Sequence, residues 1–273
     1  MARKYSLVFL TNKTWSPVEA IYNASLIGYD AISARTIPQG LPGEVRFEIT
    51  GNNELFKATK QALKDTGITM NDTELAKIDV GTDVSRYKPH LAAAAELGVK
   101  NIVTNIWVDD PVFYTDAFGC LCDIAAEFDM TVNLEFVTWA KVTNLSQART
   151  LIEKTGRKNA AILLDMLHFY RSRVTFEELE ACPKELIGIA HLCDAPLEIP
   201  TDEPSLIHTG RSERLYPGEG AIDIARIVSL LGDHVVLGIE VPNDAVVAMV
   251  GPTEHARRSF VKTREYLKKH GME

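Results

Sequence analysis

Short apolar runs rich in β-branched residues alternate with amphipathic stretches along the whole chain. The predicted strands are Tyr5–Thr11, Asp30–Arg35, Leu75–Val80, Asn101–Trp107, Thr131–Val137, Ala161–Met166, Gly188–Leu192 and Val235–Val241. Most of these runs are too apolar to leave one face in water, which is typical of parallel strands that are covered on both sides. Eight strands that each precede a helix predict an α/β fold of the (β/α)₈ TIM barrel type.

Helix signals separate the predicted strands. Ser16-Pro-Val-Glu19 combines a capping box with proline at the first helical position, and Thr175-Phe-Glu-Glu178 is a second capping box. Three further apolar stripes each end at a glycine, namely Gly67, Gly98 and Gly156. The one long irregular segment runs from Asp194 to Gly220, after the seventh strand, where it is expected to cover an active site.

Length and charge narrow the class of protein. The chain has 273 residues, 46% of them hydrophobic, and a TIM barrel typically needs about 250 residues. We therefore expect a single barrel domain over residues 1–273. The formal net charge of −8 opposes a phosphate backbone, so we expect no nucleic-acid partner.

The apolar runs are also too short for a membrane protein. The run after Arg3-Lys4 is interrupted at Asn12-Lys13, too early for a signal peptide. No stretch approaches the roughly 18 apolar residues of a membrane span. The sequence predicts a cytoplasmic protein with no membrane partner.

Charged residues stand at the carboxyl ends of four consecutive predicted strands. They are Glu135, Asp165, His191 and Glu240. In a barrel these ends converge on one mouth, and a buried carboxylate is costly unless a cation pairs with it. Three carboxylates and one imidazole suit one divalent ion, Mn²⁺ first and Mg²⁺ or Co²⁺ as alternatives. The competing interpretation is that hydrogen bonds or ion pairs at the rim satisfy each residue separately.

Other residues near the strand ends are candidates for substrate binding. His168 is expected to donate a hydrogen bond to substrate or to support a metal ligand. Arg211, with Arg214 as a second choice, is expected to bind a hydroxyl, carboxylate or phosphate, although a solvated loop arginine explains either residue equally well. Trp107 and Trp139 are expected to wall the pocket or simply to pack at the rim.

Three polar residues of the segment after the seventh strand are weaker candidates for the functional site. Asp194 and Glu219 are equally explained by hydrogen bonds to loop backbone, and His208 is expected to be plain surface.

The chain resembles the xylose isomerase-like TIM barrels, often called sugar phosphate isomerases/epimerases, nearly from end to end. The residues that carry the resemblance are Leu134-Glu135, Asp165-x-x-His168, His191-x-x-Asp194, Pro217-Gly-Glu-Gly-x-Ile-Asp223 and Gly238-Ile-Glu240. The resemblance implies that Glu135, Asp165, His191 and Glu240 bind a metal and that the two glutamates also move protons. It also leaves open a homo-oligomer.

The C-terminal part is further similar to a subgroup that includes 3-dehydroshikimate dehydratases. The similarity lies in His191-Leu-Cys-Asp194-Ala-Pro, Pro-Gly-Glu-Gly and Glu240-Val-Pro-Asn-Asp244. Some of those enzymes have glutamine in place of His191, and others have histidine in place of Val137.

The residues and the resemblance together predict a metal-dependent isomerase or epimerase. Its substrate is expected to be a small polyhydroxy ketone, a sugar or a cyclic polyol ketone, that loses a proton next to its carbonyl through a metal-stabilised enolate. Glu135 and Glu240 would approach the substrate from opposite faces as acid and base. A dehydratase-like lyase is the alternative, and a non-catalytic binding barrel is a third reading. A nuclease of the endonuclease IV type is disfavoured because the early strand ends lack histidine.

Overall fold

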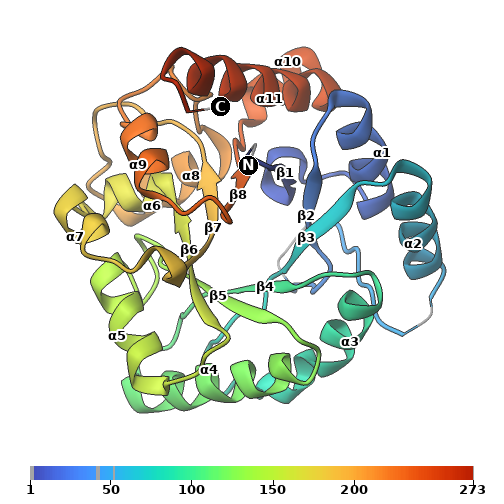
Figure 1. Ribbon diagram of the computed structural model, residues 1–273, viewed down its shortest axis with the longest axis vertical. Helices are drawn as coiled ribbons and strands as arrows, with labels where there is room; N and C mark the ends of the chain where they lie inside the picture. The colour runs from blue at the N-terminus through green and yellow to red at the C-terminus, as the bar shows by residue number, and fades with distance from the viewer. Residues whose placement is uncertain (1–2, 41–43, 52, 273) are drawn as a thin grey trace.

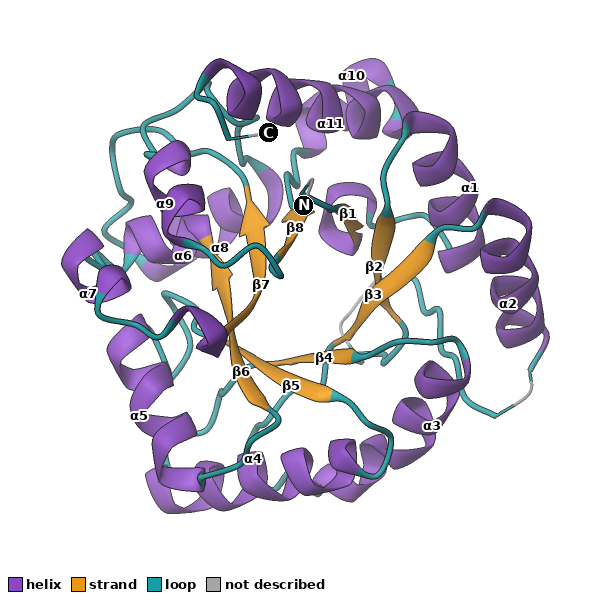
Figure 2. Ribbon diagram, viewed as in Figure 1, coloured by secondary structure: helices purple, strands orange, loops and turns teal. Residues whose placement is uncertain are grey.

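A closed barrel of eight parallel strands forms the centre of the computed structural model, which describes residues 3–40, 44–51 and 53–272. Figure 2 shows the strands in the middle and the helices in a ring around them. The predicted (β/α)₈ fold is confirmed. The predicted domain over residues 1–273 also includes residues 1–2, 41–43, 52 and 273, which lie outside the described residues.

Each strand pairs with the next one along the chain, and β1 closes the barrel against β8 (Figure 1). The strands are β1 (Tyr5–Val8), β2 (Ala31–Arg35), β3 (Thr69–Glu74), β4 (Asn101–Thr104), β5 (Thr131–Glu135), β6 (Ala160–Asp165), β7 (Ile187–Leu192) and β8 (Val236–Ile239). All six residues of β6 are buried, as expected for a strand with the barrel interior on one side and helices on the other.

The helices follow the strands in the predicted order. They are α1 (Pro17–Ile27), α2 (Glu54–Thr66), α3 (Lys88–Glu96), α4 (Pro111–Ala126), α5 (Leu145–Thr155), α6 (Met166–Arg171), α7 (Phe176–Glu180), α8 (Glu203–Ser212), α9 (Ile224–Leu230), α10 (Asp244–Val250) and α11 (Pro252–Lys269), with short 3-10 helices η1 (Phe9–Asn12), η2 (Val84–Tyr87) and η3 (Lys184–Leu186). Both predicted capping boxes are present, at Ser16 and at Thr175. Among the described residues, no helix combines the length and the apolar character that crossing a membrane requires.

The predicted third strand, Leu75–Val80, is wrong. The strand is the preceding polar segment, Thr69–Glu74, whose Asp72 is fully buried and accepts a hydrogen bond of 2.6 Å from Ser33 Oγ. Leu75–Val80 continues beyond the strand end, where the Ala76 and Ile78 amides donate to carbonyls that follow β4 in the chain or belong to it. Because most side chains of this strand are polar, although several of them are buried, the hydrophobic pattern of the sequence did not reveal it.

The segment Asp194 to Gly220 is also more regular than predicted, because it contains helix α8. Asp202 caps this helix by accepting a hydrogen bond from the Ser205 amide, and Pro204 lies in its first turn. Arg211 therefore lies in the last turn of a helix and not in a loop. The first strand is shorter than predicted, since the chain turns into η1 after Val8.

Candidate metal centre

The four strand-end residues meet at one place. One ligand atom from each of Glu135, Asp165, His191 and Glu240 lies within 4.8 Å of the corresponding atoms of the other three. The barrel register explains this convergence, because Asp165 pairs with His191 across β6 and β7. A group of carboxylate and imidazole donors this close is suited to a divalent cation.

A glycine makes room for the imidazole in this group. Gly238 on β8 pairs with His191 on β7, and a Cβ at position 238 would lie 2.7 Å from Cδ2 of His191 and 2.8 Å from Cγ2 of Val8. Any larger residue would force the histidine ring or the neighbouring strand to move.

His191 is buried without hydrogen-bond partners. Neither Nδ1 nor Nε2 makes a hydrogen bond within the described residues, although the side chain is only 3% exposed; Oε2 of Glu240 lies 3.5 Å from Nδ1 as an ion-pair contact. Burial opposes protonation of the ring, but the charges of Glu240, Asp165 and Glu135 outweigh it and raise the pKa of His191 to about 10. A buried imidazole whose ring nitrogens make no hydrogen bond, and which three carboxylates surround, is the arrangement expected of a metal ligand. The donor set thus fits a divalent cation.

Arg214 occupies the space between two of these carboxylates. Its Nη1 lies 2.6 Å from Oδ2 of Asp165 and 2.9 Å from Oε2 of Glu240, and its Nε donates to the carbonyl of Gly210 at 2.7 Å. Burial opposes ionisation of Asp165, yet the guanidinium outweighs it and lowers the pKa of that carboxyl. Arg214 was only the second candidate for substrate binding, after Arg211, because the sequence does not show which of the two arginines points into the barrel.

Glu135 is the carboxylate of the group that is not fully enclosed. Its Oε2 lies 3.4 Å from the Asn105 amide nitrogen. Burial and the neighbouring charges of Glu240 and Asp165 raise the pKa of Glu135 to about 8. A carboxyl group with a pKa near neutrality can both give and take a proton.

His168 lies near the four candidate ligands, and its hydrogen bonds define its tautomer. The backbone N–H of Thr138 donates to Nδ1 at 3.3 Å, so Nδ1 of the neutral ring is an acceptor and Nε2 carries the hydrogen. Burial lowers the pKa of His168 to about 3, which keeps the ring neutral. The Trp139 ring packs edge-on against it at a centroid distance of 4.9 Å. His168 is therefore a neutral hydrogen-bond donor.

A cavity of about 400 Å³ is lined by three of the four candidate ligands, Glu135, His191 and Glu240, whereas Asp165 is fully buried beside them. The predicted site residues His168, Arg211, Trp107 and Trp139 all line it. The indole nitrogen of Trp107 donates to Oδ1 of Asn105 at 2.6 Å, which fixes that ring. Helix α8 closes one side, where Gly210 is so close to Trp139 that a Cβ would lie 2.6 Å from the indole.

Several cavity residues were not predicted as site residues. Among them are Arg35, Gln39, Glu74 and Lys77. Glu74 is 5% exposed and closes β3, so the misplaced third strand explains why it was missed. A correct β3 would have placed this carboxylate at the barrel mouth.

The weaker candidates lie outside the cavity lining. Asp194 accepts backbone hydrogen bonds from Ala195, Gly218, Gly220 and Ile222, all between 2.9 and 3.0 Å, and therefore organises the loop. Glu219 pairs with Lys262 near the surface at 3.3 Å. His208 is exposed and lies 3.1 Å from Glu213.

Comparison with known proteins agrees with this architecture. The family model described as xylose isomerase-like TIM barrel matches residues 21–270. The inosose isomerase of Bacillus velezensis is 27% identical over 161 residues, which are 54% of this chain and 54% of that protein. The inosose isomerase of Halalkalibacterium halodurans is 31% identical over 116 residues, 41% of this chain and 38% of that protein. The chain thus matches about half, or less, of the length of these curated relatives.

Solved structures share the fold over nearly the whole chain. A structure of IOLI protein with a bound zinc atom has a TM-score of 0.80 at 20% identity and covers 98% of this chain and 99% of its own. The apo form of 3-keto-D-glucoside 4-epimerase from E. coli has a TM-score of 0.70 at 18% identity, with 97% of this chain and 100% of its own covered. From the family match over residues 21–270, the chain belongs to the xylose isomerase-like TIM barrel family.

Proposed function

We propose that the chain is a divalent-metal-dependent isomerase or epimerase of a sugar or cyclic polyol ketone. The observation that carries the proposal is the buried His191, whose two ring nitrogens make no hydrogen bond within the described residues although three carboxylates surround the ring. The inosose isomerase relatives support the substrate class, and their name makes an inosose the first ketone to test.

The metal would be held by Glu135, Asp165, His191 and Glu240. When bound, a divalent cation supplies a Lewis acid that stabilises the negative charge that develops on a carbonyl oxygen. The zinc-bound structural neighbour supports a divalent ion, and the oxygen-rich donor set keeps Mn²⁺ as our first choice, with Mg²⁺ and Co²⁺ as alternatives.

Glu135 and Glu240 would carry the proton. Glu135 ends β5, Glu240 directly follows β8, and both line the cavity, so each would reach a ketone from a different side. Removal by one and return by the other inverts a stereocentre, whereas a shuttle by one glutamate moves the carbonyl along the chain. Glu135 suits this role because it lines the cavity and is the carboxylate of the group that is not fully buried.

His168 and Arg214 would hold the substrate and the carboxylates in place. The Nε2–H of neutral His168 would donate to an oxygen next to the reacting carbon, with no proton released to it. Arg214 would hold the Asp165 and Glu240 side chains in position through its two short ion pairs.

Proton exchange tests the proposal directly. The Mn²⁺-loaded protein is incubated in D₂O with inososes, ketoses and 3-dehydroshikimate, and the products are read by proton NMR. We expect deuterium next to the carbonyl of at least one polyol ketone without loss of water. An aromatic product would indicate the dehydratase instead, and an absence of exchange with every ketone would contradict the proposal.

Two variants assign the proton transfer. Glu135→Gln and Glu240→Gln are each expected to lose at least about 100-fold in exchange rate, since general acid–base catalysis contributes about 10²–10⁴-fold. Glu219→Gln is the matched control, because Glu219 pairs with Lys262 outside the cavity lining. Full turnover by either active-site variant would remove that glutamate from the mechanism.

A further inference from the structure

Two arginines approach the cavity from elements far apart in the sequence. Arg35 ends β2, and Arg211 lies in the last turn of α8. Both line the cavity that Glu135, His191 and Glu240 also line. In a closed barrel of eight strands β2 stands opposite β6, the strand of Asp165, so Arg35 lies on the wall across from Asp165.

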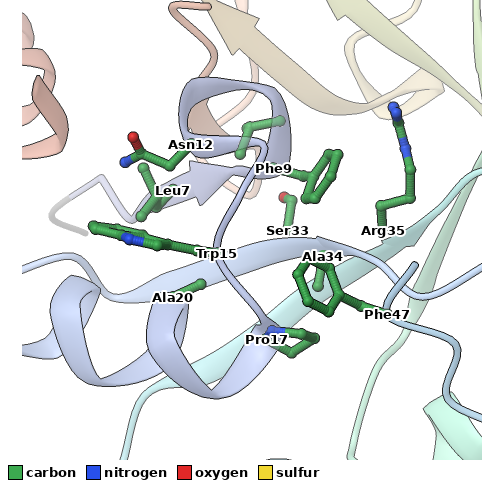
Figure 3. Close-up of a pocket in the computed structure, with 11 residues that line it drawn as sticks. Leu7, Phe9, Asn12, Trp15, Pro17, Ala20, Ser33, Ala34, Arg35 and Phe47 are labelled. Atoms are coloured by element: carbon green, nitrogen blue, oxygen red, sulfur yellow. The ribbon is translucent and has the colours of Figure 1, made fainter. Parts of the chain in front are cut away.

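Arg35 is placed for use inside the cavity. Figure 3 shows its side chain next to Phe9 and extending away from the apolar cluster around Trp15 and Pro17. Its Cζ lies 4.7 Å from the centroid of the Phe9 ring. The side chain is only 15% exposed, and its Nε has no hydrogen-bond partner among the described residues.

The counter-charges near the two arginines are incomplete. Arg35 has an ion pair with Glu74 through Nη2, at 3.3 Å, while its Nε has no hydrogen-bond partner among the described residues. For the Arg211 side chain the structure gives no ion pair or hydrogen bond within the residues it describes. The two neighbouring lysines of the cavity are already neutralised, Lys13 by Asp244 at 2.7 Å and Lys77 by Asp79 at 2.6 Å.

The two guanidinium groups also influence each other. Partial enclosure in the cavity wall lowers the pKa of Arg211, and the charge of Arg35 lowers it further, while Glu135 acts in the opposite direction. Two like charges that face one cavity repel unless an anion lies between them. A carboxylate or phosphate is the partner that matches guanidinium geometry with paired hydrogen bonds.

We propose that Arg211 and Arg35 form an anion subsite, and that the substrate is a polyhydroxy ketone bearing a carboxylate or phosphate on the side away from the metal ligands. That this ligand is a substrate rests on the proposed function, whereas the anion subsite concerns binding alone. It narrows the proposed function to ketones that carry an anionic group, with a neutral inosose expected to bind more weakly, because a neutral ligand adds no counter-charge next to the two guanidinium groups.

Matched pairs of ligands test the subsite. Calorimetric titration of the Mn²⁺-loaded protein compares D-gluconate with D-sorbitol and D-fructose 6-phosphate with D-fructose. At least one anionic member is expected to bind about tenfold or more tightly than its neutral partner, and which pair shows the preference identifies carboxylate or phosphate. Equal affinity in both pairs, or no binding of either anion, would overturn the proposal.

Three variants locate the preference. Arg211→Gln should abolish it and Arg211→Lys should retain part of it, because lysine keeps the charge but not the paired hydrogen bonds. Arg257→Gln, which removes the same charge from the exposed face of α11, should leave the preference unchanged. A preference that survives Arg211→Gln would mean that the anion binds elsewhere, such as at the metal, and would overturn the subsite.

The outcome is separable from that of the proposed function. Anion preference without proton exchange on any ketone would contradict only the isomerase activity. Proton exchange on neutral ketones with no anion preference would contradict only the subsite.

Discussion

At the scale of single residues, the candidate metal centre depends on one imidazole and the space left for it. Gly238 faces His191 across the β7–β8 pair, and the ring has no hydrogen-bond partner among the described residues. Because neither ring nitrogen makes a hydrogen bond within the described residues and Nδ1 has a long ion-pair contact of 3.5 Å with Glu240, packing largely sets the position of the imidazole. Its position is therefore sensitive to the size of residue 238.

Gly238→Ala tests this packing. The new Cβ would lie 2.7 Å from His191 Cδ2 and 2.8 Å from Val8 Cγ2, so the ring or the strand must shift. We expect a loss of about 1–3 kcal/mol in the free energy of unfolding and Mn²⁺ affinity reduced about tenfold or more. Denaturant unfolding and metal titration measure the two effects.

Gly119→Ala is the control for this variant. Gly119 lies inside α4, and the nearest atoms to its added Cβ are 3.9 Å away. Alanine should stabilise the helix by up to about 1 kcal/mol without changing metal affinity. If both alanine variants bound Mn²⁺ equally well, the proposed tight fit around His191 would be incorrect.

The sequence was most informative about residues that contrast with their surroundings. Glu135 and Asp165 end apolar strands, so a buried charge at each position was conspicuous, and the structure brings both to one cluster. Glu74 follows Asn71 and Asp72 in a strand that reads as polar, and it was missed. The inward turn of Arg214 depends on packing of α8, which no local pattern encodes.

At the scale of elements, the loops after the strands are organised by buried polar groups. Asp194 follows β7 and accepts the amides of Ala195, Gly218, Gly220 and Ile222. One carboxylate thereby joins the end of a strand to the segment that precedes α9. Buried polar side chains also explain why β3 was not predicted: its Asp72 is buried inside the barrel, whereas the prediction relied on apolar runs.

Asp194→Ala is expected to loosen this segment. Removal of the carboxylate leaves four amides without their acceptor, and we expect a loss of about 2–3 kcal/mol in the free energy of unfolding. Hydrogen exchange at the Gly218, Gly220 and Ile222 amides should accelerate. Asp202→Ala, which removes a single capping bond at α8, should cost only about 1 kcal/mol. Equal effects of the two variants would show that Asp194 does not organise the loop.

At the scale of the whole molecule, the final helix is joined to the barrel through a buried histidine. His255 on α11 has Nδ1 2.8 Å from the Tyr216 hydroxyl and Nε2 2.8 Å from the Val241 carbonyl. Burial lowers the pKa of His255, with Arg258 acting in the same direction and the Val241 carbonyl in the opposite one. The folded protein thus keeps this ring neutral below the pH at which the unfolded chain protonates it.

This difference predicts a loss of stability in mild acid. The contribution of His255 is complete above the unfolded pKa of about 6.5 and falls as the pH drops below it, because only the unfolded state then binds the proton. The decrease in unfolding free energy from about pH 7 to about pH 5 should be smaller in His255→Gln than in the wild type. Identical pH dependence in the two proteins would contradict a neutral buried His255.

The overall charge of −8 gives no sign of the positive wall at Arg35 and Arg211. Net charge averages over a surface, whereas a ligand meets only the residues that line the cavity. The fold class could be predicted from periodicity, because every strand of the barrel has a helix to cover it. The partners inside the cavity could not, because they come from strands and helices distant in sequence.

The central claim is that four residues form one divalent metal site, and Mn²⁺ binding measured by electron paramagnetic resonance of the free ion tests it most directly. The account predicts one bound Mn²⁺ per chain in the wild type, at least about 100-fold weaker binding in His191→Gln, and unchanged binding in His208→Gln, whose histidine is exposed. Binding in His191→Gln as tight as in the wild type, or no binding of any divalent ion by the wild type, would contradict it.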